Sequence, residues 1–403
     1  MTSQEKRLSF VEFVAMIAML FATIAFSIDA MLPALPEIAR ELSAEAPNRA
    51  QLILTSFVLG MGLGTFIAGP LSDTFGRRRV IVAGAVLYCI GAFAAYVSSG
   101  LEAVLVARLV QGIGAAGPRV VSLALVRDLY KGREMARVVS FAMMVFSLVP
   151  AIAPLLGSVI IAGFGWRSIF LAFIAFALIG SGWLWFRQPE TLPPEARRPL
   201  NAGALWSALR EVLTHRTVLY AVSVQTLCFG ALFATLSSTQ PLFDETFGRG
   251  GEFPLWFALI AVVSGSASLV NAALVVRLGM RRMVAVTLVV QLALSAAFAV
   301  FWLSGSGDMP GSTLPFALYI GWTISVFFMA GLTLGNLNAI ALEPMGHVAG
   351  MAASATGAIA TVLSVVIAAP IGLMFDGTPV PLAASIAILC AAGVALMQRM
   401  PRS

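Results

Sequence analysis

Long apolar segments alternate with short polar ones along the whole chain. Each apolar segment has about 20 residues, enough for one helix to cross a hydrocarbon layer about 30 Å thick. The first is too long for a signal-peptide core and has no small-residue cleavage site after it, so we interpret it as a retained helix. The pattern predicts an all-α membrane protein with twelve transmembrane helices, at 10–33, 51–72, 79–98, 101–124, 138–161, 166–187, 217–242, 254–276, 283–304, 313–341, 348–374 and 379–398.

Composition and charge agree with this interpretation. The chain is 59% hydrophobic and 11% charged, and its mean hydropathy is +0.94. Most of the Lys and Arg residues collect on one side of the membrane if both chain ends lie on that side, which identifies it as the cytoplasmic side. We therefore expect a multi-pass protein of a bacterial inner membrane with both termini in the cytoplasm. The net charge of +6 then reflects the basic residues that orient the protein in the membrane. No nucleic-acid partner is expected, because the arginines lie in separate short loops.

One longer polar segment divides the predicted helices into two sets of six. We expect an N-terminal six-helix bundle at 1–187, a cytoplasmic linker with an interfacial helix at 188–216, and a C-terminal bundle at 217–403. The strings FGRRRV (75–80) and LGMRRM (278–283) take the same place in the two halves, which indicates an internal repeat with a cavity between the bundles near the midplane. The apolar face of the interfacial helix is expected at Leu205, Leu209, Val212 and Leu213.

The titratable side chains argue against enzyme chemistry. Cys89, Cys228 and Cys390 lie inside apolar spans, and the two histidines, His215 and His347, lie near helix ends. A membrane enzyme would need paired acids, a metal cluster or a nucleophile with its base. We therefore expect a protein that is not an enzyme and that uses no cofactor and no metal.

The string GPLSDTFGRRRV, which begins at Gly69, joins the second and third predicted helices. Asp73 can end the second helix, and Gly76 allows a tight turn. Arg77 and Arg78 follow, and Asp73 can pair with an arginine of this loop or with basic groups at other helix ends. Such contacts would form a conformational latch if they broke in one state; the simpler interpretation is that the arginines only keep the loop inside. The string resembles the loop between the second and third helices of major facilitator superfamily transporters.

Three ionisable side chains lie well inside predicted spans: Asp29, Arg108 and Arg119. A charge at membrane depth costs at least about 2.5–3.5 kcal/mol, so each should face a cavity or a partner. Asp29 and Arg108 each lie about six residues, or roughly 9 Å, below the same membrane face. Burial disfavours an ionised carboxyl and a nearby arginine favours it, so Asp29 could load and release a proton. A static ion pair is the alternative, and Arg119 could bind an anionic group or extend into the cavity.

The first-helix string SIDAMLPALPEIA, residues 27–39, resembles a signature of the drug:proton antiporters of the bicyclomycin/chloramphenicol resistance type. Asp29 matches the aspartate of that signature, and Met31 stands where relatives often have tyrosine. The resemblance implies a twelve-helix exporter with an aspartate that takes part in proton coupling.

The string RLVQGIGAAG, residues 108–117, resembles the fourth-helix motif of the same group. Arg108 and Gln111 match this motif, whose arginine is implicated in proton coupling. Arg119 lies about one turn before the position at which many relatives carry another arginine.

The string PAIAPLLGSVI, residues 150–160, resembles a fifth-helix motif that exporters carry and most symporters lack. Pro150 and Pro154 remove backbone donors, so the helix can kink. Gly157 permits close packing against a neighbouring helix. We expect these three residues to form a tight contact between the halves; an ordinary kinked helix is the alternative.

The second half of the sequence indicates fewer candidate residues for substrate contacts. Polar side chains within membrane bundles often only join helices, and Gln291, Asn271 and Asn336 are open to that interpretation. We nevertheless predict a substrate site from polar and adaptable side chains along the first, fourth, seventh and tenth helices. Its members are Asp29, Met31, Phe26, Gln111, Arg119, Gln225, Phe229 and Asn338.

These features together favour a proton-coupled multidrug efflux antiporter that exports small, largely apolar drugs by alternating access, with phenicol-like or bicyclomycin-like compounds as candidates. The alternative is a proton-coupled exporter of a natural metabolite such as an amino acid or a sugar. A non-transporting sensor of the same fold is a third possibility. The expected partners are a small-molecule drug, protons and the lipid bilayer, and we expect the chain to work as a monomer.

Overall fold

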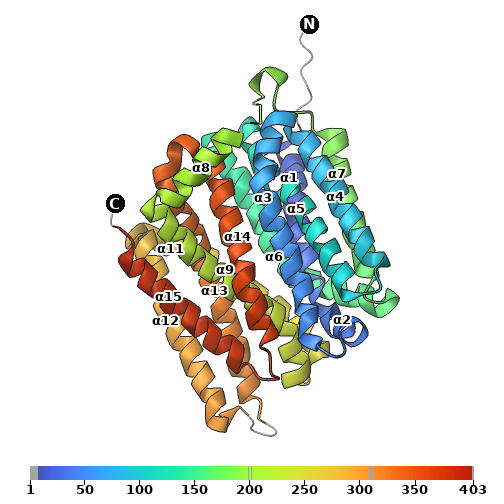
Figure 1. Cartoon of the computed structure of the whole chain (residues 1–403), viewed down its shortest axis with the longest axis vertical. Coiled ribbons are helices and arrows are strands. Elements are labelled where there is room, and N and C mark those ends of the chain that lie inside the picture. Colours follow the sequence, from blue (N-terminus) through green and yellow to red (C-terminus); the bar gives the residue numbers. More distant parts are fainter. Residues whose placement is uncertain (1–7, 198, 201, 308–311, 402–403) are drawn as a thin grey trace. The chain divides into compact units, whose positions relative to one another are not determined.

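The computed structural model describes residues 8–197, 199–200, 202–307 and 312–401. Within those ranges every regular element is helical, and twelve segments are long and apolar enough to span a membrane. The predicted all-α membrane protein with twelve transmembrane helices is confirmed; Figure 1 follows the chain from blue to red. The twelve segments are Phe10–Leu42, Pro47–Phe75, Arg77–Val97, Leu101–Leu129, Gly132–Phe164, Ser168–Arg187, Arg216–Thr246, Gly250–Leu278, Met280–Ser306, Leu314–Gly346, Ala349–Leu373 and Val380–Arg399.

Two compact units make up the chain. Unit 1 consists of Met1–Met31 and Ser56–Leu205, and unit 2 consists of Leu32–Thr55 and Trp206–Ser403. The segment between the first two spans therefore belongs to unit 2 by its contacts, although the helices that it joins lie mostly in unit 1. The bundle boundaries expected at residues 187 and 216 stay predictions.

Unit 1 is built from six long helices. Helix α4 packs along α5 and α7, and α1 packs against α5, α6 and α7. The helices are α1 (Phe10–Asp29), α3 (Leu52–Phe75, in unit 1 from Ser56), α4 (Arg77–Val97), α5 (Leu101–Leu129), α6 (Gly132–Phe164) and α7 (Ser168–Arg187).

Glycines allow α5 to lie very close to α3. A Cβ atom at Gly60 of α3 would meet the carbonyl oxygen of Leu109, and one at Gly112 of α5 would meet the carbonyl oxygen of Phe57. Only a hydrogen atom fits at either position, because a side chain would collide with the facing backbone. This close approach places the turn of α5 that begins with Arg108 inside the unit.

Helix α1 ends at Asp29 rather than at residue 33, and the reason lies four residues further along. Pro33 has no N–H group to bond the carbonyl of Asp29, and its ring would clash with that carbonyl in a continued helix. The chain turns at Ala30 and Met31 and then forms η1 (Leu32–Ala34) and α2 (Leu35–Leu42). The predicted single helix over 10–33 was therefore too long.

Unit 2 contains the remaining spans. Helix α9 packs against α13, α14 and α15, and α12 packs against α13 and α15. The eighth span is broken at Ser266 into α10 and α11, where a single helix over 254–276 was predicted. Besides η1 and α2, the elements are η2 (Pro47–Gln51), α9 (Arg216–Pro241), η4 (Leu242–Thr246), η5 (Gly250–Glu252), α10 (Phe253–Gly265), α11 (Ala267–Leu278), α12 (Met280–Phe301), η6 (Trp302–Ser306), α13 (Leu314–Leu342), η7 (Glu343–Val348), α14 (Ala349–Leu373) and α15 (Val380–Arg399).

The linker contains η3 (Pro194–Ala196) and the amphipathic helix α8 (Ala202–Thr214). Val212 is buried and Leu209 is partly buried, as expected for the apolar face. Leu213 is exposed, and its place on the membrane-facing side of the helix stays a prediction. The side chain of Leu205 lies outside the described residues.

The two related loops begin with the same backbone turn. Gly76, before α4, has φ 99° and ψ 154°, and Gly279, before α12, has φ 78° and ψ 151°. This region of φ and ψ is essentially restricted to glycine. The shared conformation at the start of the third span of each half supports the internal repeat that the two sequence strings suggested.

Candidate functional site

The guanidinium group of Arg108 closes the end of α1. Because α1 stops at Asp29, its last carbonyl groups lack helical partners. One guanidinium nitrogen of Arg108 donates to the carbonyl of Ser27 at 3.0 Å, and the other donates to Oε1 of Gln111 at 2.7 Å. The group also lies over the ring of Phe57, 4.4 Å from its centroid. Arg108 is fully buried, so hydrogen bonds and an aromatic face take the place of water around a permanent charge.

Asp29 lies two residues beyond the carbonyl that Arg108 binds. Its side chain is 5% exposed. Among the residues that the structure describes, none forms a hydrogen bond or an ion pair with this carboxyl group. The structure therefore brings Asp29 and Arg108 to the same end of α1 without an ion pair between them. Their common depth in the membrane stays a prediction. A direct pairing of the two side chains stays a prediction.

A buried hydroxyl pair adjoins this arrangement. The hydroxyl groups of Ser27 and Tyr88 are hydrogen-bonded to each other, and Ser27 also donates to the carbonyl of Thr23. Tyr88 comes from α4 and is 1% exposed. Neither residue was predicted from the sequence. Ser27 stands in the quoted first-helix string, whereas nothing in the spacing of Tyr88 distinguishes it from an ordinary core aromatic.

The glycine of the fifth-helix motif contacts the same end of α1. A Cβ atom at Gly157 of α6 would meet the carbonyl oxygen and the Cα atom of Ala30, the residue after Asp29. Helix α6 runs through Pro150 and Pro154 without interruption. The close contact of Gly157 thus lies within unit 1, where a contact between the two halves was expected.

Charged side chains gather at the start of α4. Arg77 forms ion pairs with Asp73 and with Asp128, the latter at 3.0 Å between Nε and Oδ2, and it also donates to the hydroxyl of Ser72 at 2.7 Å. Asp73 therefore pairs within its own loop, which was one of the two predicted arrangements. Asp128, near the end of α5, was not predicted. Gly69, which opens the loop string, lies in α3, where its carbonyl accepts a hydrogen bond from Ser72.

A linker carboxylate caps α4. Oε1 of Glu190 accepts from the backbone N–H of Arg77 at 2.9 Å, and Oε2 accepts from that of Arg78 at 3.2 Å. These are two of the four N–H groups that a helix leaves without partners at its start, and a negative charge is favoured there. The Arg78 guanidinium lies 4.0 Å from the ring centroid of Trp185. Glu190 was missed because nothing in the sequence links the linker to this loop.

The predicted substrate residues of unit 1 differ in accessibility. Phe26, Met31 and Gln111 are buried; Phe26 packs on Phe173 and Phe176, with ring centroids 5.5 and 5.1 Å away. Arg119 is exposed although it lies past the middle of α5, and its guanidinium lies 3.5 Å from the sulfur of Met61. Arg119 is therefore the one of these four whose side chain is accessible in this structure.

In unit 2 the predicted residues come from two helices, α9 and α13. Gln225 is buried on α9, and its Oε1 has no hydrogen-bond partner among the described residues. Phe229, one turn further, stacks on Phe233 with centroids 5.7 Å apart. Asn338 is exposed on α13.

Other polar side chains of unit 2 join helices instead. Asn336 of α13 donates to Asn271 of α11 at 2.7 Å. Gln291 and Trp322 both donate to the hydroxyl of Ser295 at 3.1 Å. Asn271 and Asn336 thus have the helix-joining contact that the simpler interpretation expected. Gln291 bonds within its own helix, α12, and Trp322 of α13 joins the two helices through Ser295.

The segment before α3 is bound to α9 and α14 by polar contacts inside unit 2. The side-chain amide of Asn48 donates to the carbonyls of Leu373 and Phe375 at 3.2 and 2.7 Å. Oε1 of Gln51 accepts from the hydroxyl of Ser238 at 3.3 Å. These bonds fasten the segment between the first two spans to the end of α14.

Comparison with known proteins identifies relatives along nearly the whole chain. A family model described as Major Facilitator Superfamily matches residues 15–370. The "Bicyclomycin resistance protein homolog" of Haemophilus influenzae is 29% identical over 364 residues, covering 89% of this chain and 88% of that protein. The "Chloramphenicol resistance protein" of Pseudomonas aeruginosa is 29% identical over 354 residues, covering 79% and 81%. A solved structure, "Crystal structure of D-xylose-proton symporter", has a TM-score of 0.77 at 14% identity and covers 97% of both chains, which supports the fold alone.

Proposed function

The chain belongs to the Major Facilitator Superfamily, and within this family we propose that it is a proton-coupled antiporter that exports small, largely apolar drugs. Membership of the family makes it a multi-pass membrane transporter of small molecules and not an enzyme. Relatives named for bicyclomycin and chloramphenicol resistance, at 29% identity, support drugs of those two types as the first substrates to test. A bacterial inner membrane with both termini in the cytoplasm is part of the proposal, and the distribution of basic residues supports it.

The observation that carries the proposal is the end of α1. Asp29, whose carboxyl group has no partner among the described residues, is buried two residues from a carbonyl that accepts a hydrogen bond from the buried guanidinium of Arg108. An isolated buried carboxylate is costly, so such a group exchanges a proton when its surroundings change. A small movement of α1 relative to α5 would transfer the guanidinium between the Ser27 carbonyl and the carboxylate.

The transport cycle we propose follows from that exchange. Protonated Asp29 needs no cation beside it, and Arg108 then remains on Ser27 and Gln111, as in this structure. Release of the proton leaves a carboxylate that attracts Arg108 and rearranges the end of α1. One proton that moves through 100 mV supplies about 2.3 kcal/mol, which supports a substrate gradient of roughly fifty-fold.

Two further contact sets support alternating access. The segment Leu32–Thr55 is bound to unit 2 while its flanking helices lie in unit 1, so its bonds through Asn48 and Gln51 connect the two units along the chain. At the start of α4, the ion pairs of Arg77 with Asp73 and Asp128 form a candidate latch. We propose that both sets of contacts form in one state and break in another.

The decisive experiment uses the full chain in proteoliposomes with an imposed pH gradient and chloramphenicol or bicyclomycin as substrate. In a gradient of about 1.7 pH units, which is equivalent to 100 mV for one proton, Asp29→Asn should reduce accumulation from roughly fifty-fold to about one. Exchange of substrate for substrate without a gradient should continue. Asp244→Asn, at an exposed carboxylate of η4, is the matched control and should accumulate substrate normally. Full gradient-driven accumulation by Asp29→Asn would disprove the coupling role.

The same liposomes separate the two substrate classes. A panel of phenicols and bicyclomycin is compared with amino acids and sugars at equal pH gradients. Uptake of drugs alone supports multidrug export. Uptake restricted to one metabolite would contradict multidrug export and support the alternative, an exporter of a natural metabolite. If no compound were exchanged, the protein would not be a transporter.

A further inference from the structure

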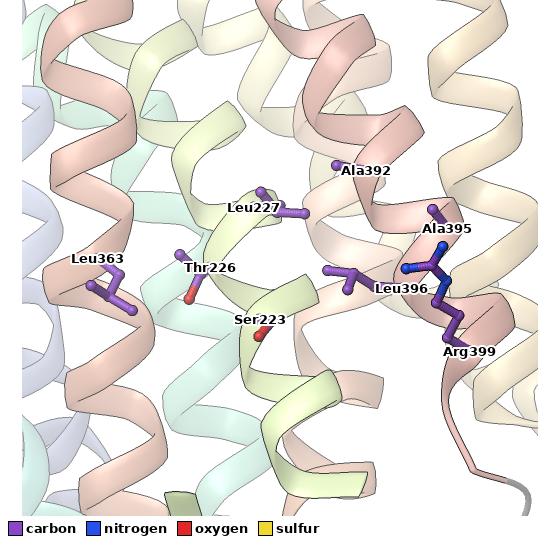
Figure 2. A pocket seen from close by; sticks show the side chains of 8 residues that line it. All are labelled: Ser223, Thr226, Leu227, Leu363, Ala392, Ala395, Leu396 and Arg399. Carbon is purple, nitrogen blue, oxygen red and sulfur yellow. The ribbon is translucent and has the colours of Figure 1, made fainter. Parts of the chain in front are cut away.

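A groove lies on the surface of unit 2, apart from the residues discussed so far. It has a volume of about 440 Å³ and runs between α9, α14 and α15 (Figure 2). Its walls are Leu227, Leu363, Ala392, Ala395 and Leu396, with Ser223, Thr226 and Arg399 as its polar members. All of these residues belong to unit 2.

The groove is open along its apolar wall. Leu363 is 48% exposed, Ala392 and Ala395 are exposed, and Leu227 and Leu396 are partly exposed. From Ala392 to Arg399 the wall of α15 extends about 10 Å along the helix axis. In a membrane, apolar side chains in this position contact hydrocarbon. The length of the apolar wall matches part of an acyl chain and is greater than the length of a compact polar solute.

The polar groups lie toward one end of the groove. Arg399 is the last residue of α15 and is exposed, and the structure records no carboxylate in ion-pair contact with it among the described residues. Figure 2 shows its guanidinium beside Ala395 and Leu396 at the edge of the groove. The hydroxyl of Thr226 already donates to the carbonyl of Val222 at 2.9 Å. The hydroxyl of Ser223 makes no such bond with any residue that the structure describes, so it remains available as a donor.

Arg216 adds a second cation at this end. It is the first residue of α9, two turns before Ser223, and it is exposed. The groove is lined by the first half of α9 and by the last turns of α15. The start of α9 and the end of α15 therefore lie at the same membrane face. The entrance of the groove therefore carries positive charge, while its interior is apolar.

From this arrangement we infer that the groove is a binding site for one anionic phospholipid of the leaflet at which α15 ends. One acyl chain lies along Leu363, Ala392 and Leu396. The phosphate group lies against the guanidinium of Arg399, with the hydroxyl of Ser223 as a further donor. Basic pockets between transmembrane helices bind anionic headgroups in this way. A charged amphiphile is selected only because the groove combines an apolar wall with a cation. The inference does not depend on which substrate the protein carries.

The test measures lipid binding to the purified full-length protein in detergent by native mass spectrometry. Phosphatidylglycerol and phosphatidylcholine with identical acyl chains serve as the two probes. Arg399→Gln should weaken the binding of phosphatidylglycerol about fivefold and leave phosphatidylcholine nearly unchanged, because one cation near a headgroup favours an anionic lipid by that factor. Ala395→Phe should fill the groove and weaken both lipids.

Two matched variants make the result specific. Arg282→Gln removes an exposed arginine from the first turn of α12, and Ala293→Phe enlarges an exposed alanine of the same helix, both outside the groove. Neither should change lipid binding. Equal losses for Arg399→Gln and Arg282→Gln would overturn the proposal, since they would indicate an effect of net charge only.

A photoactivatable phosphatidylglycerol with a diazirine in its acyl chain provides a readout on the unmodified protein. Labels should map to the segments around Leu363 and Ala392–Leu396. Labelling spread evenly over the surface helices, or absent from α14 and α15, would show that no lipid is held in the groove.

Discussion

Single residues at the end of α1 carry most of the proposed mechanism. Pro33 ends the helix, the freed Ser27 carbonyl binds Arg108, and Gly157 packs against Ala30. Asp29 lies between these contacts, so its surroundings depend on how closely α6 approaches the turn. A substitution that pushes α6 away should therefore disturb the carboxyl group without touching it.

At the residue scale we predict that Gly157→Val destabilises the protein and impairs transport. The added methyl groups would collide with the carbonyl of Ala30, and such overpacking costs about 1–3 kcal/mol. Thermal unfolding in detergent and drug accumulation in liposomes provide the measurements. Gly163→Ala is the control, because a Cβ atom at Gly163 of the same helix has no neighbour within 4 Å. Equal stability of both variants would argue against the close contact.

At the scale of elements, α4 shows how a helix start depends on distant segments. Gly76 provides the turn, Asp73 and Asp128 hold Arg77, and Glu190 of the linker accepts from the first N–H groups of the helix. The carboxylate also accepts from the backbone of Leu192 in its own segment at 3.2 Å. Glu190 thus fastens the start of the linker to the loop between the second and third spans.

We predict that Glu190→Ala loosens the start of α4. Loss of a capping side chain costs about 0.5–2 kcal/mol, and the first amides of α4 should exchange hydrogen for deuterium faster. Hydrogen exchange followed by mass spectrometry on the peptide that contains Arg77 and Arg78 measures this effect. Glu195→Ala, at an exposed position of the same linker, should leave that peptide unchanged. If the two variants behaved alike, the cap would have no measurable role.

At the scale of the whole molecule, the division of the chain does not follow its linear order. The segment Leu32–Thr55 is part of unit 2 although it interrupts unit 1 in the sequence. Asn48 binds the carbonyls at the end of α14, and a Cβ atom at Gly372 would meet Oε1 of Gln51. The chain therefore passes from unit 1 to unit 2 at Met31, two residues after Asp29.

We predict that Asn48→Ala weakens this connection. Two hydrogen bonds to backbone carbonyls would be lost, and each is worth about 0.5–1.5 kcal/mol. The end of α14 and the segment Pro47–Gln51 should exchange amide hydrogens faster, while the core of α5 should not. Glu45→Ala, an exposed neighbour in the same segment, serves as the control. Unchanged exchange at α14 in Asn48→Ala would contradict the role of these bonds.

The sequence by itself determined the features that depend on local physics. Twelve apolar segments of spanning length and the tight turn at Gly76 can be recognised because hydrophobic length and the free φ angle of glycine act within a few residues. The end of α1 before Pro33 was missed, although the missing N–H of proline is a signal of the same local kind. The resemblance of three short strings to family motifs pointed to the same residues that the structure gathers at the end of α1. Asp29 and Arg108 could therefore be named before any coordinates.

Only the tertiary structure decided which groups these residues meet. Arg108 binds the carbonyl of Ser27 where an ion pair with Asp29 was considered, and Arg77 and its loop are held by Asp128 and Glu190, which no pattern had marked. Such contacts join residues far apart in the chain, and their geometry is set by how closely glycines allow helices to pack. Spacing along a sequence contains no information about that distance, because it arises only when the helices are assembled.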